Sequence, residues 1–370
     1  MFSRGSWFCC LALVSAAFFF IAAGSATQWG LGAFVRPPGG NPVVTPESES
    51  VFFCPMRKAP VHWEALHTFN PAAVVRDGKV MLLYRAEDDT GNPEIGGHTS
   101  RLGLAESDDG LHFTRRGTPV LYPEDDDQKT REWEGGCEDP RVVETENGAY
   151  VLTYTQWNRK TTDAAIATSK DLQSWAKHGP IFAQASGGKY RDLSYKSAGI
   201  VCRVSRSRLI AAKIKGEYWM YWGEGAIRLA TSDDLIHWRP VENPNGEPIV
   251  VLSKRTGHFD SSFPEVGPPP VLTRDGIVVL YNGKNAAQNG DPILTPGSYA
   301  VGEALFAADD PARLVARTDT PVFKPELPFE RSGQYAAGTT FAEGLVFFRS
   351  KYFLYYGCAD SFVGVAVSED

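Results

Sequence analysis

A short phrase recurs five times along this chain, and its fifth copy ends the sequence. Each copy alternates apolar and polar residues, reaches a fixed position that is Ser in four copies, and continues into acidic turn residues. The fixed position recurs at intervals of roughly 60 to 76 residues, at Ser107, Ser169, Ser232, Ala308 and Ser368. A repeat of this length indicates a fold assembled from equivalent units, so one unit describes the architecture of most of the chain.

Each unit is predicted to hold four antiparallel strands. In the first unit, Ala72–Val75 and Val80–Tyr84 flank Arg76-Asp77-Gly78-Lys79, which has the composition of a tight hairpin turn. The repeated phrase adds a third strand by its alternation, and the segment after its turn adds a fourth. Five units of four strands predict an all-β protein, a five-bladed β-propeller. A β-sandwich also has short strands and Gly-rich turns, but the regular spacing favours the propeller.

The fifth unit stops after its third strand, because the chain ends within the repeated phrase. A blade left in this state exposes an unpaired strand edge, which proteins avoid because such edges pair with other chains. We therefore expect an N-terminal strand to complete the last blade, and the segment Val51–Leu66 is predicted to supply it.

The first 26 residues have the pattern of a secretory signal peptide. Arg4 gives a basic start, Trp7–Ala23 is an apolar run, and Gly24-Ser25-Ala26 is a small-residue cleavage site. We expect an exported protein, periplasmic or secreted, whose residues 27–370 form a single propeller domain. The apolar run is short for a membrane span, so stable membrane insertion is not expected, although an uncleaved anchor is the alternative.

Charge and cysteine usage narrow the partners and cofactors. The formal net charge is −7, which makes nucleic acid an improbable partner. Beyond the predicted signal peptide, Cys54, Cys137, Cys202 and Cys358 are scattered without a C-x-x-C pair, and the His residues are dispersed. Neither pattern predicts a metal site or a cofactor. Export permits a Cys54–Cys358 disulfide in the closing blade, but buried free thiols are the favoured interpretation.

Propeller geometry predicts where a functional site lies. The innermost strand of each blade starts at one face of the ring and the second strand returns to it, so the residues flanking these strands surround one mouth. Unusual polar residues occupy those positions in every unit. They are Asn70, Arg85, Asp139, Arg141, Lys196, Glu224, Glu265, Asn282 and Asp360.

The composition of this predicted mouth suits a sugar, because acids and amides bind hydroxyl groups and aromatic rings stack on the C–H face. The sequence contains no phosphate-binding Gly-rich motif, no H-E-x-x-H and no Gly-x-Ser-x-Gly. Each residue also has a structural interpretation: Asp139 and Arg141 could form an ion pair in a turn, and Glu224 could be a solvated loop acid. Their convergence on one mouth favours a functional site.

The same positions resemble those of glycoside hydrolase family 130, which comprises β-mannoside phosphorylases and β-1,2-mannosidases. The resemblance extends from about Phe69 to Asp360, and its stretches are specific when taken together. They are Asn70-Pro71-Ala72, Tyr84-Arg85-Ala86, Gly136-Cys137-Glu138-Asp139-Pro140-Arg141, Gly267-Pro268-Pro269-Pro270, Tyr281-Asn282-Gly283 and Tyr355-Tyr356-Gly357-Cys358-Ala359-Asp360.

The resemblance implies an inverting mechanism. It implies that Asp139 is the general acid, with its proton passing through the 3-hydroxyl of the bound mannose. In the mannosidase branch a pair of glutamates activates water, and the matching positions are Glu224 and Glu265. We expect the mannose itself to be held by Asn70, Arg85, Arg141, Lys196, Asn282 and Asp360.

Electrostatics favour hydrolysis over phosphorolysis. Two ionised glutamates would repel a phosphate dianion by several kcal/mol in a desolvated site. Water needs a carboxylate base, and inverting enzymes hold their acid and base roughly 6.5–9.5 Å apart to admit it. We therefore expect an exported β-mannosidase, exo-acting on β-1,2-linked mannose in an oligosaccharide or glycan.

Three alternatives remain open at this level. A β-mannoside phosphorylase would result if Lys196, Lys284, Arg141 and Arg85 assembled an anion site. A catalytically idle, carbohydrate-binding propeller would keep the mouth without turnover. A furanosidase-like propeller would use three acids, but the sequence context of Asp139 argues against it.

Overall fold

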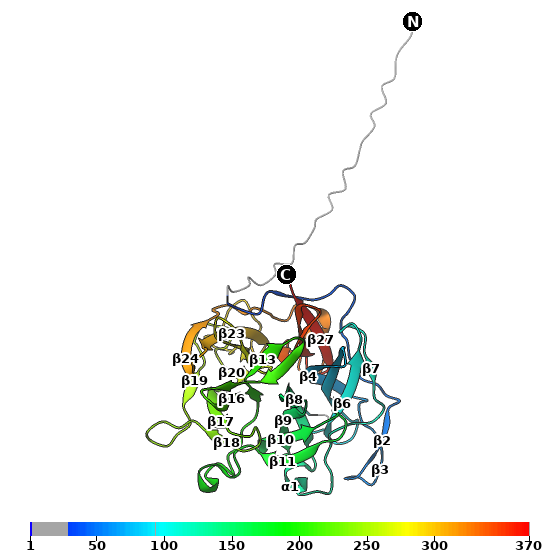
Figure 1. The fold of residues 1–370 in the computed structure, drawn as a ribbon. Coiled ribbons are helices and arrows are strands. Elements are labelled where there is room, and N and C mark those ends of the chain that lie inside the picture. The colour runs from blue at the N-terminus through cyan, green and yellow to red at the C-terminus, as the bar shows by residue number, and fades with distance from the viewer. Residues whose placement is uncertain (2–28, 93, 370) are drawn as a thin grey trace.

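The computed structural model describes residues 1, 29–92 and 94–369. Apart from its first residue, the predicted signal peptide lies outside the described residues. The described part is almost entirely β-structure (Figure 1), with one four-residue helix, α1 (Lys129–Glu132), and two 3-10 turns, η1 (Ala185–Gly188) and η2 (Pro328–Glu330). This confirms the all-β prediction.

The antiparallel pairings place most of the strands in five groups that follow one another along the chain (Figure 1). The first contains β4 (His67–Arg76), β5 (Lys79–Glu87), β6 (Ser100–Ser107) and β7 (Thr114–Arg115). The second contains β8 (Gly136–Glu144), β9 (Tyr150–Trp157), β10 (Thr162–Ser169) and β11 (Ala176–Pro180). The third contains β12 (Ala198–Ile200), β15 (Lys213–Ile214), β16 (Glu217–Trp222), β17 (Ile227–Ser232), β18 (Trp238–Pro240) and β19 (Val250–Leu252).

The last two groups complete the series. The fourth contains β20 (Phe263–Val266), β21 (Val271–Leu272), β22 (Ile277–Lys284), β23 (Tyr299–Ala307) and β24 (Asp310–Arg317). The fifth contains β25 (Thr340–Phe348), β26 (Lys351–Cys358), β27 (Phe362–Ser368) and β1 (Phe34–Val35). A hairpin of β13 (Cys202–Ser205) and β14 (Arg208–Ala211) pairs with β21 of the fourth group and with β8 of the second. Strand β4 lies against both β8 and β25.

The N-terminal part of the chain does supply the outer strand of the fifth group, but from a different segment than predicted. Phe34 pairs with Ser368 and Val35 with Val367, in antiparallel register. The predicted segment Val51–Leu66 instead pairs with itself, as β2 (Val51–Cys54) against β3 (Ala59–His62). Arg36 fixes the closing strand, because its Nε lies 2.6 Å from Glu330 Oε1 and its Nη2 donates to the Lys324 carbonyl at 2.6 Å.

The hydrophobic core lies between neighbouring groups. Leu82 belongs to a cluster shared with the fifth group, where it packs with Tyr355, whereas the adjacent Leu83 belongs to a cluster shared with the second group and Leu152. Successive side chains of a strand point to opposite faces, so both faces of β5 are buried along Leu82–Tyr84, where its sequence is apolar. Each such Leu contributes about 1.5–3 kcal/mol on burial.

The repeated phrase forms a turn held by one aspartate. Asp109 Oδ1 accepts hydrogen bonds from the backbone N–H groups of Leu111 and His112, and Asp171 and Asp234 repeat this arrangement. In the first and third copies, the preceding Asp108 and Asp233 make none of these hydrogen bonds. Both of those side chains are exposed, as the turn directs them into solvent.

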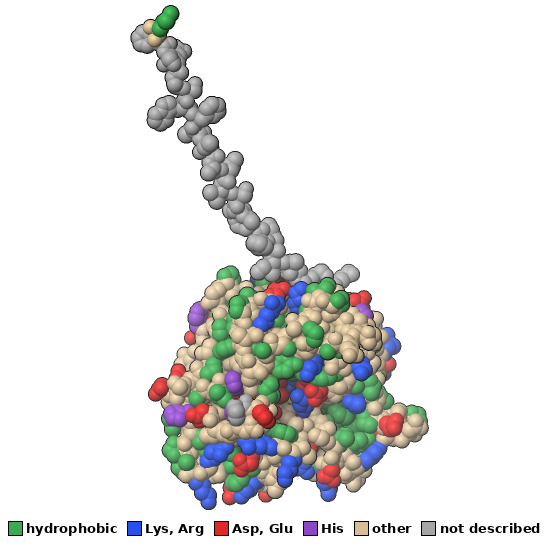
Figure 2. All heavy atoms as spheres, turned by 180° about the vertical axis from the view of Figure 1, so that it is seen from behind, with side chains coloured by type: hydrophobic (Ala, Val, Ile, Leu, Met, Phe, Trp, Pro, Cys, Tyr) green, Lys and Arg blue, Asp and Glu red, His purple; other side chains and the backbone are tan. Residues whose placement is uncertain are grey.

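The four cysteines of the described residues are buried free thiols, so Cys54 and Cys358 form no disulfide. No helix in the described residues has the length and apolarity needed to cross a membrane. Within the same residues, no group of three or more His, Cys, Asp or Glu side chains is arranged to hold a metal ion. On the face shown in Figure 2, acidic and basic side chains are interspersed.

Candidate active site

Three innermost strands break their pairing at equivalent points, and polar residues occupy the breaks. The register shifts between Phe69 and Pro71 in β4, between Glu138 and Arg141 in β8, and between Ala342 and Gly344 in β25. The interruptions leave Asn70, Asp139 and Glu343 outside the regular ladder. Asn70 and Asp139 have positive φ values of 45° and 49°, a conformation that Asn and Asp tolerate better than most residues.

Prolines stabilise two of these breaks. Asn70 precedes Pro71 and Asp139 precedes Pro140, and a proline offers no N–H group to a ladder. The local sequence therefore ends regular pairing where the side chain must leave the plane of the sheet. This is the physical reason for the Asn-Pro and Glu-Asp-Pro-Arg stretches at the predicted mouth.

Asp139 lies in a buried network of charged and amide groups. Its Oδ1 accepts a hydrogen bond from Asn70 Nδ2 at 2.9 Å and another from Arg85 Nη1 at 3.1 Å. Arg85 Nη2 also lies 2.7 Å from Glu87 Oε1 and 2.9 Å from Glu138 Oε1. One guanidinium thus serves three carboxylates, and the structure brings Asn70, Arg85 and Asp139 together as the sequence predicts.

The two adjacent acids, Glu138 and Asp139, divide their protons unequally. Burial alone would raise the pKa of Asp139, but the Arg85 guanidinium outweighs it and, with Lys196 and Asn70, holds that pKa below its ordinary value. Burial raises the pKa of Glu138 to about 7. The positive charge of Arg85 acts to lower this pKa, and the negative charge of Asp139 acts to raise it. The proton of this pair is therefore held more tightly by Glu138 than by Asp139.

Lys196 joins the two glutamates that were predicted to activate water. Its Nζ lies 3.6 Å from Glu224 Oε1 and 3.7 Å from Glu265 Oε1, and an isolated β-bridge pairs the two glutamates in the backbone. Glu265 is fully buried, its Oε1 accepts a hydrogen bond from Ser197 Oγ, and its Oε2 is buried without a hydrogen-bond partner. Glu224 is more open, with 38% of its side chain exposed.

The charges of this trio depend on one another. Burial raises the pKa of Glu265, and the nearby Glu224 adds to this effect while Lys196 opposes it. Burial alone would lower the pKa of Lys196, but Glu265 and Glu224 outweigh it and raise that pKa above its ordinary value. Lys196 therefore stays charged and keeps both carboxylates beside it. A buried carboxylate oxygen with no partner, such as Glu265 Oε2, is an acceptor for a water O–H.

Two predicted sugar-binding residues are engaged with protein groups instead. Arg141 Nε and Nη2 donate to the carbonyls of Gly267 and Val266, both at 2.7 Å. Asn282 is fully buried, and its amide makes two hydrogen bonds to the backbone of Ala342, at 2.8 and 3.0 Å. The structure places both residues in the frame that holds the site, where their donors already have partners.

Asp360 faces the same network from the fifth group. Burial raises its pKa to about 7, and the charges of Asp139 and Glu87 support this against Arg85. Its carboxylate makes no hydrogen bond within the described residues, whereas its backbone carbonyl accepts one from Gln334 Nε2 at 2.8 Å. Asp360 therefore presents a free carboxyl group, as a sugar-binding residue must.

The raised pKa of Asp360 predicts a pH-dependent cost in stability. Between its ordinary pKa of 3.8 and its folded value of about 7, the folded state binds more protons than the unfolded chain. The free energy of unfolding therefore falls as the pH rises through this window. We expect Asp360→Asn to raise that free energy by about 1–2 kcal/mol at about pH 8, and by much less at about pH 4. Denaturant unfolding at both pH values checks this, and an equal change at both contradicts it.

Sequence reasoning missed part of the site. Glu343 is fully buried at the break in β25, and its Oε1 lies 2.7 Å from Arg141 Nη1. Glu87, Glu138 and Ser197 complete the contacts of the predicted residues but were not among them. The signal for Glu343 was its position, because it occupies the same break in the innermost strand as Asn70 and Asp139.

The site contains more acids than bases. Its carboxylates belong to Glu87, Glu138, Asp139, Glu224, Glu265, Glu343 and Asp360. The buried or half-buried bases beside them, Arg85, Arg141 and Lys196, each lie within ion-pair distance of at least one of these acids. Lys284 does not join them, and its Nζ instead lies over the rings of Phe263, Tyr299 and Tyr335, at 5.2–5.6 Å from their centroids.

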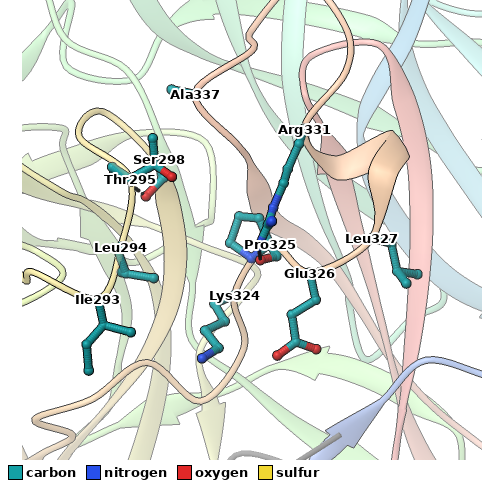
Figure 3. A pocket seen from close by; sticks show the side chains of 10 residues that line it. All are labelled: Ile293, Leu294, Thr295, Ser298, Lys324, Pro325, Glu326, Leu327, Arg331 and Ala337. Atoms are coloured by element: carbon teal, nitrogen blue, oxygen red, sulfur yellow. Dashed lines mark hydrogen bonds between the residues drawn. The ribbon is translucent and has the colours of Figure 1, made fainter. Parts of the chain in front are cut away.

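A cavity of about 570 Å³ opens beside Lys196 and Glu224. Lys196 and Glu224 form part of its wall, together with Tyr190, Tyr195 and Trp222. Another cavity, of about 390 Å³, lies between the loops that precede β23 and β25 (Figure 3). Its ten lining residues, all in the described part of the chain, include none of the site acids. Of these two cavities, the first is the one lined by site residues, Lys196 and Glu224.

Comparison with known proteins agrees with this geometry. The family model for glycoside hydrolase family 130, described as beta-1,4-mannooligosaccharide phosphorylase, matches residues 48–370. A 1,2-beta-oligomannan phosphorylase from Thermoanaerobacter sp. (strain X514) is 32% identical over 318 residues, covering 85% of this chain and 94% of the relative.

Two solved structures are more similar. A glycosyl hydrolase from Bacteroides ovatus is 50% identical, with a TM-score of 0.91 over 93% of this chain and 96% of its own. The other is described by the statement that "the GH130 family of mannoside phosphorylases contains glycoside hydrolases that target beta-1,2 mannosidic linkages in Candida mannan". It is 51% identical, with a TM-score of 0.92 over 94% of this chain and 96% of its own. The chain therefore belongs to glycoside hydrolase family 130, whose members act on β-mannosides.

Proposed function

We propose that this chain is an inverting β-mannosidase that uses water to release single mannose units from β-1,2-linked mannosides. The observation that carries the proposal is the pairing of Lys196 with both Glu224 and Glu265. Two carboxylates stand where a phosphorolytic enzyme needs an anion site, and they already neutralise the nearest base. A phosphate entering there would meet net negative charge at short range, at a cost of several kcal/mol.

The contacts of the other bases support the same conclusion. Arg85 is held by Glu87, Glu138 and Asp139, and Arg141 is held by Glu343 and backbone carbonyls. Freeing either guanidinium for phosphate would leave buried carboxylates without a partner, which costs about 3–5 kcal/mol for a broken buried pair. Water needs no such rearrangement, because Glu265 Oε2 is already an unoccupied acceptor.

The roles in the reaction follow from the positions. Glu265, assisted by Glu224, orients the water and takes its proton as the oxygen attacks the anomeric carbon. Asp139 takes up the proton that Glu138 holds in the free enzyme and delivers it toward the leaving oxygen through the 3-hydroxyl of the sugar. Asn70, Arg85, Asp360 and Lys196 line the space for the mannose.

We also propose that the five strand groups are the blades of a five-bladed β-propeller formed by residues 27–370, and that the protein is exported through its first 26 residues. The contact of β4 with β25, which brings the first and fifth groups together, supports the closed ring. The pairing of β1 with β27 supports closure by the N-terminal strand. The apolar run Trp7–Ala23 and the small residues after it support export.

The dependence of the rate on phosphate tests the proposed hydrolysis. We expect the initial rate of β-1,2-mannobiose cleavage to be the same with and without millimolar phosphate. Mannose release followed by an enzymatic mannose assay measures this rate. A rate that is zero without phosphate and saturates as phosphate is added would overturn the proposal.

A β-mannoside phosphorylase is the second candidate. Lys284 favours it, because the described residues place no carboxylate within ion-pair distance of its ammonium group. The identity to the Thermoanaerobacter phosphorylase points the same way. Three aromatic rings already surround Lys284, however, and one base does not balance a phosphate dianion beside the acids of this site.

A further inference from the structure

Arg141 and Glu343 link the two halves of the catalytic apparatus. Arg141 extends from β8, two residues after Asp139, and its Nη1 donates to the Asp139 backbone carbonyl at 3.2 Å. Its Nε and Nη2 bind the carbonyls of Gly267 and Val266, directly after Glu265. The side chain of Arg141 therefore ties the strand that carries the acid to the strand that carries the water-activating Glu265.

Glu343 fixes the remaining arm of this guanidinium. Its Oε1 lies 2.7 Å from Arg141 Nη1, and the side chains of Arg141 and Glu343 are 1% and 0% exposed. Asn282 anchors the backbone just before Glu343, with hydrogen bonds to both the N–H and the carbonyl of Ala342. The backbone next to Glu343 is thus anchored, whereas its two carboxylate oxygens make no hydrogen bond and contact Arg141 only as an ion pair.

We propose that Glu343 is a positioning residue for the reaction: as the ion-pair partner of Arg141 Nη1, it holds the guanidinium between the strands that carry Asp139 and Glu265 and so sets the placement of both. The charged and titratable groups that face Glu343 are Arg141 and Asp139 from β8, Glu265 from β20 and Arg85 from β5. The position of the Arg141 charge matters to the chemistry, because it lowers the pKa of Asp139 and also that of Glu265.

Loss of the acceptor has a defined consequence. Without Glu343, the guanidinium keeps its contact with the Asp139 backbone and is free to move toward the Asp139 carboxylate. The Glu138–Asp139 pair then binds its proton less tightly, and the proton needed by the leaving group is lost at a lower pH. The strand carrying Glu265 also loses its fixed distance from the acid, which lowers kcat more than it raises KM.

Glu343→Leu and Glu343→Gln separate this role from simple packing. Glu343→Leu is expected to lower kcat about 100-fold with a smaller change in KM, and to move the alkaline limb of the kcat/KM profile to lower pH by about half a unit. Glu343→Gln keeps an acceptor oxygen for Arg141 and is expected to retain kcat within about fivefold and the wild-type profile. The rates are measured on folded protein, quantified by its unfolding transition.

A matched control is available at Glu64. It is also fully buried, lies 3.2 Å from Arg115 Nη1 and has one carboxylate oxygen without a hydrogen-bond partner. Glu64→Leu is expected to lower stability while leaving the pH profile unchanged. If Glu343→Leu does not fold, Arg141→Lys takes its place. Lysine keeps the positive charge but lacks the planar guanidinium that binds several acceptors at once, so the same fall in kcat is expected.

The inference fails if Glu343→Leu, or Arg141→Lys in its place, keeps the wild-type kcat and profile per folded molecule, or if Glu343→Gln behaves like Glu343→Leu. It rests on the proposed roles of Asp139 and Glu265. If the proposed hydrolysis is wrong, the wild-type enzyme will cleave β-1,2-mannobiose only when phosphate is present. The variants are then compared with phosphate present, so the two failures remain distinguishable.

Discussion

Asp139→Asn is expected to lower kcat for β-1,2-mannobiose hydrolysis by about 10³-fold, within the range of 10²–10⁴ typical for loss of a general acid. An amide cannot deliver a proton, yet it can still accept from Asn70 and Arg85, so folding and sugar binding are expected to survive. Steady-state kinetics on purified protein measures the effect.

A substrate with a good leaving group makes this prediction sharper. 4-Nitrophenyl β-mannoside needs little protonation of its leaving oxygen, so Asp139→Asn is expected to lose far less activity on it than on mannobiose. Asp260→Asn serves as a control, because Asp260 is fully buried and bound by Arg255 and Arg317 without contacting the site acids. An equal loss on both substrates would assign Asp139 a structural role.

Glu224→Gln and Glu265→Gln are each expected to lower kcat by at least about 10²-fold, with the larger loss at Glu265. Glu265 is fully buried and has a free acceptor oxygen, whereas Glu224 is 38% exposed and acts beside it. Activation of water precedes attack on any mannoside, so these losses are expected to be the same for mannobiose and the nitrophenyl substrate.

The double variant and a control complete this test. Residues that act as one unit are not additive, so Glu224→Gln combined with Glu265→Gln is expected to lose little more than Glu265→Gln alone. Glu144→Gln is the control, since Glu144 is the last residue of β8 and is paired with Arg208, which is not a site residue. Near-wild-type hydrolysis by both single glutamate variants would refute the assignment of the base.

The sequence predicted the strand groups well because the repeat marks each of them. The turn of the repeated phrase depends on local contacts, such as those of Asp109 with the next few N–H groups, and local contacts leave a pattern in the sequence. The closing strand β1 left no such pattern in the sequence. Phe34–Val35 is too short to alternate, and its position depends on distant partners such as Glu330, which binds Arg36.

The candidate site divides in the same way. Asn70 and Asp139 could be found because a proline follows each of them and marks the break in pairing. Glu343 has no such mark, because Gly344 follows it and the surrounding residues read as an ordinary strand. Arg141 and Asn282 bind backbone carbonyls of segments that are distant in the sequence, and the residue type alone does not reveal such contacts.

The central claim is that water, and not phosphate, attacks the anomeric carbon. The most direct measurement is NMR and mass analysis of the products of β-1,2-mannobiose cleavage in ¹⁸O-labelled water that also contains phosphate. The account predicts free mannose, formed first as the α-anomer, with ¹⁸O incorporated at its anomeric carbon. Formation of mannose 1-phosphate, with no label at that carbon, would contradict it.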